Sequence, residues 1–359
     1  MPSDAPDPLM VHFHPDHNGV EEVDLDDLAA HCRIIDVRSP GEFEQDHIPG
    51  SSNVPLLGDA ERAVVGTLYR VKGKESATQW ALHKLQSRSD DFLAALRSQI
   101  GCEEQPVICC ARGGDRSRNV VQFLNQQGVS AKRLTGGYRS YRKTVIGRLE
   151  QIQLDGLWVL DGLTGAGKTA VLQSLACKYP GRVLDLEEYA GHRSSILGDV
   201  GKLPKTQKQF ESLLAAALDA LDDNSPWILI EGESRKVGNR QIPKSLWDMM
   251  QTAPRIELVR DLDSRARLLV EEYRTEEGWG PVIERVEALR AYDPLGSAGV
   301  DAVQSLLRCE QPVDAAKILL QKHYDPRYLH GSEQRTYSFR ISETSTDEAV
   351  QQLLQALDS

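Results

Sequence analysis

The sequence lacks a long hydrophobic segment. No run of 18 apolar residues occurs among its 359 residues, so no transmembrane helix is expected. The first residues, MPSDAPDPLMVHFHPDH, contain neither a basic n-region nor an apolar h-region, and they predict no secretory signal. We therefore expect a cytoplasmic protein with no membrane partner, in which residues 1–20 form a loosely ordered leader.

The sequence also lacks the cysteine patterns of a metal or disulfide scaffold. Its six cysteines are scattered, without a C-x-x-C pair or zinc spacing. Because no export signal is present, reduced thiols are expected, and neither a structural disulfide nor a structural metal site is predicted.

Acidic residues are missing from one stretch of an otherwise acidic chain. The net charge is −11, yet residues 116–149 contain no Asp or Glu and eight Lys or Arg. A solvated basic face is the plain interpretation, and binding of an anionic macromolecule is the alternative, since local fields rather than net charge decide such binding. The residues that would contact such a macromolecule include two tyrosines and are Arg118, Lys132, Arg133, Tyr138, Arg139, Tyr141, Arg142 and Lys143.

Strand and helix patterns alternate through the first part of the chain. Their order predicts a small α/β domain with a parallel sheet over residues 21–148. The predicted strands cover residues 33–37, 106–110 and 129–134, and the predicted helices cover 23–32, 77–98 and 116–127, with a short helix within the turn-rich loop 38–55.

A second strand-loop-helix unit begins at Leu157. Residues 149–359 are predicted to form a P-loop NTPase-like, doubly wound α/β domain, whose part after about residue 262 is mostly helical. Its predicted strands cover residues 157–160, 182–186, 227–231 and 255–259, with a helix at 169–178.

A cysteine lies at the start of a glycine-containing loop between a strand and a helix, in the segment PVICCARGGDRSRNVVQFL. The loop from Cys110 to Arg116 has the form C-x5-R. Its backbone amides, the helix N-terminus and the arginines would stabilise a thiolate, so we predict that Cys110 is nucleophilic with a lowered pKa. Cys109 would point to the opposite side of the strand and fill the core. The predicted loop residues are Arg112, Gly113, Gly114 and Arg116.

Residues 162–169, GLTGAGKT, fit G-x-x-x-x-G-K-[ST] between a predicted strand and a predicted helix. Such a loop binds phosphates through backbone amides and a lysine. Thr169 and Asp185 are candidate Mg²⁺ contacts, although no metal site is firmly assigned. Glu231 and Glu233 end the nearest Walker B-like strand. The predicted diphosphate-binding residues are Gly162, Thr164, Gly165, Ala166, Gly167, Lys168 and Thr169.

The cysteine loop and the segment IIDVRSPGEFEQDHIPGSSNVP at 34–55 resemble the rhodanese family, as does LTGGYRSYR at 134–142. In that family the loop cysteine carries a persulfide. The loop here is one residue longer than is common in rhodaneses. It has the size seen in rhodanese-fold phosphatases, which leaves phosphatase chemistry open or indicates a pocket for a tetrahedral phosphate-bearing donor.

A rhodanese-like domain followed by a P-loop domain resembles the tRNA 2-selenouridine synthase family. Five segments carry this resemblance beyond the two general motifs, and it extends from about residue 8 to 350. They lie at 61–77 (ERAVVGTLYRVKGKESA), 184–199 (LDLEEYAGHRSSILGD), 206–211 (TQKQFE), 231–243 (EGESRKVGNRQIP) and 323–328 (HYDPRY).

The resemblance implies two steps on the wobble 2-thiouridine of tRNA. Geranyl diphosphate alkylates the sulfur, and selenophosphate then replaces the geranylated sulfur with selenium. The P-loop would hold the diphosphate, Cys110 would act in the selenium step, and the basic stretch would bind tRNA rather than DNA, with Tyr138 and Tyr141 stacking a base. No tightly bound cofactor is expected, with Mg²⁺ as a candidate.

Three alternatives remain open from the sequence. They are an ATP-dependent rhodanese-type sulfurtransferase or kinase fusion acting on RNA or a small molecule, a non-enzymatic tRNA-binding or sulfur-carrier module, and a cysteine-dependent phosphatase. An intact C-x5-R loop and Lys168 disfavour a purely binding function.

Overall fold

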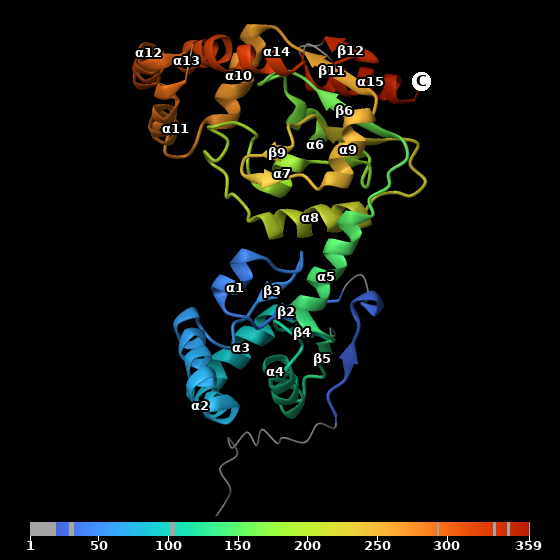
Figure 1. Cartoon of the computed structure of the whole chain (residues 1–359), viewed down its shortest axis with the longest axis vertical. Helices are drawn as coiled ribbons and strands as arrows, with labels where there is room; N and C mark the ends of the chain where they lie inside the picture. Colours follow the sequence, from blue (N-terminus) through green and yellow to red (C-terminus); the bar gives the residue numbers. More distant parts are fainter. Residues whose placement is uncertain are drawn as a thin grey trace, which may run out of the picture. The chain divides into compact units, whose positions relative to one another are not determined.

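The computed structural model divides into two compact units, residues 1–147 and 148–359 (Figure 1). It describes residues 19–28, 32–100, 105–292, 294–332, 335–342 and 345–358, so most of the expected leader lies outside the described residues. Within these ranges, no helix combines the length and the apolar character needed to cross a membrane.

The first unit is built on a five-stranded sheet in which every neighbouring pair is parallel, as predicted. Ile35 pairs with Ile108, and both are fully buried in the core of the unit. The strand order is β1 (Glu22–Val23), β5 (Lys132–Leu134), β4 (Val107–Cys109), β2 (Ile34–Asp36) and β3 (Ser52–Asn53). The helices are α1 (Pro40–Gln45), α2 (Asp59–Gln86), α3 (Ser89–Gln99), α4 (Asp115–Gln126) and α5 (Gly137–Glu150).

Two predicted helices of this unit are wrong in extent. In place of a helix over 23–32, residues 22–23 form the edge strand β1, because their backbone groups pair with β5. Residues 25–27 form a 3₁₀ turn. Residues 29–31 lie outside the described residues. The helix predicted over 77–98 is two helices, separated at Ser87 and Arg88. Arg88 holds this break in place by donating hydrogen bonds to the Leu56 carbonyl and to Glu61.

The second unit contains another five-stranded parallel sheet, with a separate two-stranded hairpin. The sheet order is β12 (Phe339–Ser342), β11 (Arg255–Val259), β6 (Leu157–Asp161), β8 (Ile228–Glu231) and β7 (Val183–Leu184), and the hairpin is β9 (Lys236–Val237) with β10 (Arg240–Gln241). The edge strand β12 was not predicted, because residues 339–342 lie in a region whose surrounding pattern is helical.

Helices make up most of the second unit, including nearly all of its C-terminal part, as predicted. α6 and α15 pack on the sheet, while α10, α12 and α13 form a separate helical core with η2 (Figure 1). The helices and helical turns of the second unit are α6 (Lys168–Lys178), α7 (Leu186–Ala190), α8 (Gln207–Asp219), α9 (Lys244–Thr252), α10 (Leu262–Tyr273), α11 (Gly280–Val286), η2 (Glu287–Ala291), α12 (Gly296–Arg308), α13 (Pro312–Leu319), the π-helical turn η3 (Leu320–Tyr324), α14 (Asp325–Ser332) and α15 (Thr346–Leu357).

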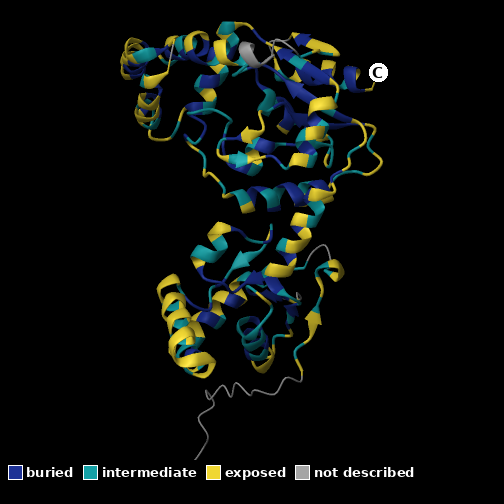
Figure 2. Ribbon diagram, in the orientation of Figure 1, coloured by how far each residue is buried: buried dark blue, intermediate teal, exposed yellow. Residues whose placement is uncertain are grey.

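Burial differs between the strands and the helices of the two units (Figure 2). The inner strands β2, β4, β6 and β8 are buried almost throughout. Helix α2, in contrast, is exposed along most of its length and buries only Ala77 and Leu85. A non-helical residue, Gly73, interrupts α2 at φ 86°. Both candidate loops begin where a buried strand, β4 or β6, ends.

Candidate functional site

The cysteine loop sits on a glycine turn that follows β5. Cys110 comes directly after β4, and α4 begins five residues later. The amide of Tyr138 donates to the Cys110 carbonyl at 2.9 Å. Gly137 has φ 57°, and a Cβ there would lie 2.1 Å from that same carbonyl oxygen, so no larger residue fits without moving the loop. The turn at 136–137 thus fixes the position of Cys110.

The two adjacent cysteines occupy different surroundings. Cys109 is fully buried, and burial together with the charge of Asp36 raises the pKa of its thiol well above the usual value. Cys110 is 2 % exposed, belongs to the buried cluster between the sheet and α4, and its Sγ lies 3.1 Å from Ser117 Oγ. Cys109 is thus held as a neutral core thiol, and the nucleophilic role of Cys110 stays a prediction.

Most cations of the basic stretch form ion pairs within their own unit. Arg116, predicted to assist the cysteine, pairs with Glu42 at 3.0 Å, and this contact brings the pKa of Glu42 down to about 2 although burial alone would raise it. The other pairs are Arg118–Asp115, Lys132–Glu21, Arg133–Glu22, Arg142–Asp46 and Arg148–Asp219. By contrast, Arg112, Arg139 and Lys143 are exposed and have no ion-pair partner among the described residues.

The two tyrosines of this stretch are packed into the fold. Tyr141 is 8 % exposed, so its ring is not available to stack a base, contrary to our expectation. The Tyr138 hydroxyl donates to Asp46 at 2.6 Å, and the guanidinium of Arg38 lies 3.9 Å from its ring centroid. Tyr138 therefore links two parts of the first unit, and any RNA contact would depend on the exposed cations.

Arg139→Glu tests the prediction that the basic stretch binds tRNA: it should weaken that binding and reduce its salt dependence. Each lost phosphate contact should lower the slope of log K against log[salt] by about 0.7–0.9. Arg97→Glu is the matched control, because Arg97 is exposed on α3, outside the basic stretch, and causes the same change in net charge. Titrations at several salt concentrations measure both slopes. Identical behaviour of the two variants would show that the stretch is only a solvated face.

The phosphate loop connects β6 to α6, as predicted. Gly167 has φ 88° and stands as the N-cap of α6, so the amides at the start of this helix face the loop. Lys168 Nζ donates to the Gly162 carbonyl at 3.2 Å. Arg265, which the sequence did not single out, braces the loop by donating to the Thr164 carbonyl at 2.9 Å and pairing with Asp325. The loop is therefore formed and supported from α10 and α14.

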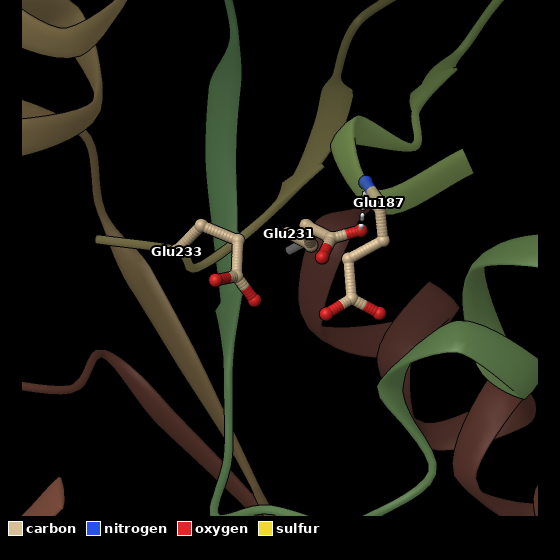
Figure 3. A group of neighbouring side chains, drawn as sticks. All are labelled: Glu187, Glu231 and Glu233. Carbon is tan, nitrogen blue, oxygen red and sulfur yellow. Dashed lines mark hydrogen bonds between the residues drawn. The ribbon is translucent and has the colours of Figure 1, made fainter. Parts of the chain in front are cut away.

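Three carboxylates face one another beside this loop (Figure 3). One oxygen each from Glu187, Glu231 and Glu233 lies within 4.8 Å of the others. Burial and the charge of Glu233 raise the pKa of Glu187 to about 8, and burial with the charge of Glu187 raises that of Glu231 well above its usual value. Burial also raises the pKa of Glu233. Although burial opposes it, these carboxylates raise the pKa of Lys168. The lysine thus stays charged next to a concentrated acidic cluster.

Asp185, a candidate Mg²⁺ contact, caps α7 by accepting the Glu188 amide at 2.9 Å and is also hydrogen-bonded to Glu231. It does not line the phosphate cavity itself, and its role as a metal contact stays a prediction. The oxygen donors that line the cavity include Glu187, Glu233 and the predicted Thr169. Together with Glu231 they fit the ligand preference of Mg²⁺, which would neutralise part of a bound diphosphate.

The phosphate loop opens into a cavity of about 690 Å³. All seven predicted diphosphate-binding residues line it, as do Arg193, Arg327 and Arg335. Three of the segments outside the general motifs, at 184–199, 231–243 and 323–328, also contribute to its walls. His323 is buried there, its Nδ1 has no hydrogen-bond partner among the described residues, and burial lowers its pKa to about 4. These segments, distant in sequence, thus form one cavity.

We expect Glu187→Gln to flatten the pH dependence of stability. A carboxyl whose pKa is raised on folding, from 4.5 to about 8, binds more protons in the folded state between these values. The free energy of unfolding therefore falls as the pH rises through that window. Glutamine does not titrate, so Glu187→Gln removes the part of this fall that Glu187 causes. Urea unfolding at pH 5 to 8 measures this, with Glu188→Gln, an exposed neighbour, as control. A wild-type decline that persists unchanged in Glu187→Gln would refute the assignment.

Two family models match the chain, one within each unit. Residues 22–144 match the family model described as a rhodanese-like domain, and residues 155–293 match that of the tRNA 2-selenouridine synthase AAA domain. The chain is also similar to a solved structure, the N-terminal domain of a protein named for ATP/GTP binding from Clostridium difficile 630. That match has 34 % identity and a TM-score of 0.33, and it covers 35 % of this chain and 99 % of the other. The predicted order, a rhodanese-like domain and then a P-loop-like domain, is confirmed.

Proposed function

We propose that this chain, which belongs to the tRNA 2-selenouridine synthase family, performs both geranyl transfer and selenium transfer on tRNA. Its two domains are those of a tRNA-modifying transferase. In the first step, geranyl diphosphate alkylates the sulfur of a wobble 2-thiouridine. In the second, selenium from selenophosphate replaces the geranylated sulfur.

The first step converts a poor leaving group into a better one. An electron pair of the thiocarbonyl sulfur forms the bond to C1 of the geranyl group, the C1–O bond breaks, and its electrons leave with pyrophosphate. The proton on N3 of the base is lost. Lys168 and the loop amides would stabilise the charge that develops on the pyrophosphate. This step consumes no ATP.

The single observation that carries this proposal is the composition of the phosphate cavity. At about 690 Å³, it has room for far more than a diphosphate. The phosphate loop with Lys168 lines it, and so do the apolar side chains of Ile196 and Leu269. A donor with a diphosphate and a hydrocarbon chain could contact both the phosphate loop and the apolar side chains. Inorganic phosphate could contact only the phosphate loop.

The second step is assigned to the cysteine loop. The thiolate of Cys110 would add to C2 of the geranylated base and expel geranylthiolate, which takes up the thiol proton. Selenium of selenophosphate would then displace Cys110, and water would cleave the selenium–phosphorus bond to release phosphate. No oxidant or reductant is needed. The fixed position of Cys110 between β4 and α4 supports this role.

An ATP-dependent reaction is the second candidate, and the acidic cluster is the observation that favours it. Carboxylates beside a P-loop lysine are also used by P-loop NTPases to hold Mg²⁺ and position water. The test is geranyl transfer to a 2-thiouridine tRNA with and without ATP, followed by mass spectrometry of the nucleosides. Geranylation without ATP supports the proposal, and a strict ATP requirement would overturn it.

A further inference from the structure

A second, smaller cavity adjoins the phosphate cavity in the helical core of the second unit. It has a volume of about 40 Å³ and lies among α10, α11, α12 and α13. Leu269, Tyr273 and Tyr324 line both spaces, so these side chains stand between them. The rest of its lining is apolar or aromatic and includes Trp279 and Ala316. The phosphate cavity therefore has an apolar wall with an apolar recess behind it.

The tyrosines of this wall have their polar atoms satisfied elsewhere. Tyr273 Oη lies 3.1 Å from Ser195 Oγ. Burial raises the pKa of Tyr273 well above its usual value and that of Tyr324 to about 12, with Ser195 also hydrogen-bonded to Tyr324. Both hydroxyls are thus protonated at neutral pH and directed to one serine. Tyr324 ends the π-helical turn η3, a feature that is frequent at functional sites. The rings can therefore face a hydrocarbon without leaving a hydroxyl unpaired.

We propose that this wall and recess bind the hydrocarbon chain of the prenyl diphosphate and measure its length. The inference rests on the proposed function, because it takes the diphosphate to lie on the phosphate loop. The recess is too small for a ten-carbon chain, since a single water molecule occupies about 30 Å³ of liquid. The body of the chain would lie in the larger cavity against Ile196 and Leu269, and only its branched end would enter the recess.

A recess of this size explains why one chain length would be preferred. A shorter five-carbon chain would not reach it, and a fifteen-carbon chain would require the helices to separate. A difference of one methylene in an apolar pocket changes kcat/KM by about 10–200-fold. Discrimination by a whole isoprene unit should be at least as large as the lower end of that range.

Two substitutions on α13 test the inference in opposite directions. Ala316→Leu fills the recess, and we expect kcat/KM for geranyl diphosphate to fall by about tenfold or more, with little change for dimethylallyl diphosphate. Leu319→Ala enlarges the recess, and we expect kcat/KM for farnesyl diphosphate to rise relative to kcat/KM for geranyl diphosphate. Ile318→Ala is the matched control, because Ile318 lies on the same helix and packs in the core without lining the recess. Competition by inorganic pyrophosphate reports whether the phosphate loop is intact.

The outcomes separate this inference from the proposed function. If the wild-type protein does not transfer a geranyl group, the proposed function fails and the inference fails with it. If the wild-type protein does so, but the preference among the three donors is the same in Ala316→Leu, Leu319→Ala and Ile318→Ala, the recess does not measure the chain. A changed preference with unchanged competition by pyrophosphate is the predicted result.

Discussion

Lys168→Ala is expected to reduce geranylation of a 2-thiouridine tRNA by about 10²–10³-fold. Lys168 follows the N-cap of α6 and lines the phosphate cavity, where it is the charged group of the predicted diphosphate-binding loop. Its charge would act on the leaving pyrophosphate, an interaction that strengthens as the carbon–oxygen bond breaks. Selenation of a tRNA that already carries the geranyl group should change much less, because that substrate has no diphosphate.

The control for this variant lies on the same helix. Lys178 ends α6 and is exposed, so Lys178→Ala removes a lysine without touching the loop. Rates of both half-reactions, measured without ATP, give the comparison. If a folded Lys168→Ala protein loses both half-reactions to the same extent, the assignment of the diphosphate step to the phosphate loop is wrong.

Cys110→Ser is expected to abolish selenium incorporation, because a hydroxyl is not deprotonated at neutral pH as a thiol can be. Geranylation should survive this change, since the proposal assigns that step to the other domain. Cys110 and its neighbour provide a matched pair of substitutions one residue apart. Cys109 is fully buried and its raised pKa keeps the thiol neutral, so Cys109→Ser should retain most of the selenation.

The measurement is the amount of 2-selenouridine formed from pre-geranylated tRNA and selenophosphate. Circular dichroism of each variant shows whether the fold is retained. Equal selenation by the wild-type protein and Cys110→Ser would remove Cys110 from the mechanism. Equal loss in both serine variants would instead mean that the strand β4, rather than one thiol, is required.

The strongly patterned parts of both sheets could be predicted from the sequence. The strands at 34–36, 107–109, 157–161 and 228–231 are short apolar runs bounded by turn residues, and each lies within or next to its predicted range. Helix α6 follows from the glycine-rich motif before it. These elements are determined by local signals, namely apolar runs and glycine turns, which a single sequence carries.

The remaining elements depend on distant partners. Residues 339–342 become a strand only because β11 offers a free edge, and residues 22–23 only because β5 does. The site shows the same limit. Glu187 and His323 are separated by more than one hundred residues and have no common motif, yet both line the phosphate cavity. The available signal was the resemblance of their segments to one family, which pointed to the segments without assigning roles to individual residues.

The most direct test of the central claim is the complete reaction of the purified wild-type protein. It would be incubated with a tRNA carrying 2-thiouridine, geranyl diphosphate and selenophosphate, without ATP, and the nucleosides would be followed by mass spectrometry over time. The account predicts that geranylated 2-thiouridine appears first and then declines as 2-selenouridine forms, with both products absent when geranyl diphosphate is omitted. Formation of 2-selenouridine without geranyl diphosphate, or a strict need for ATP, would contradict it.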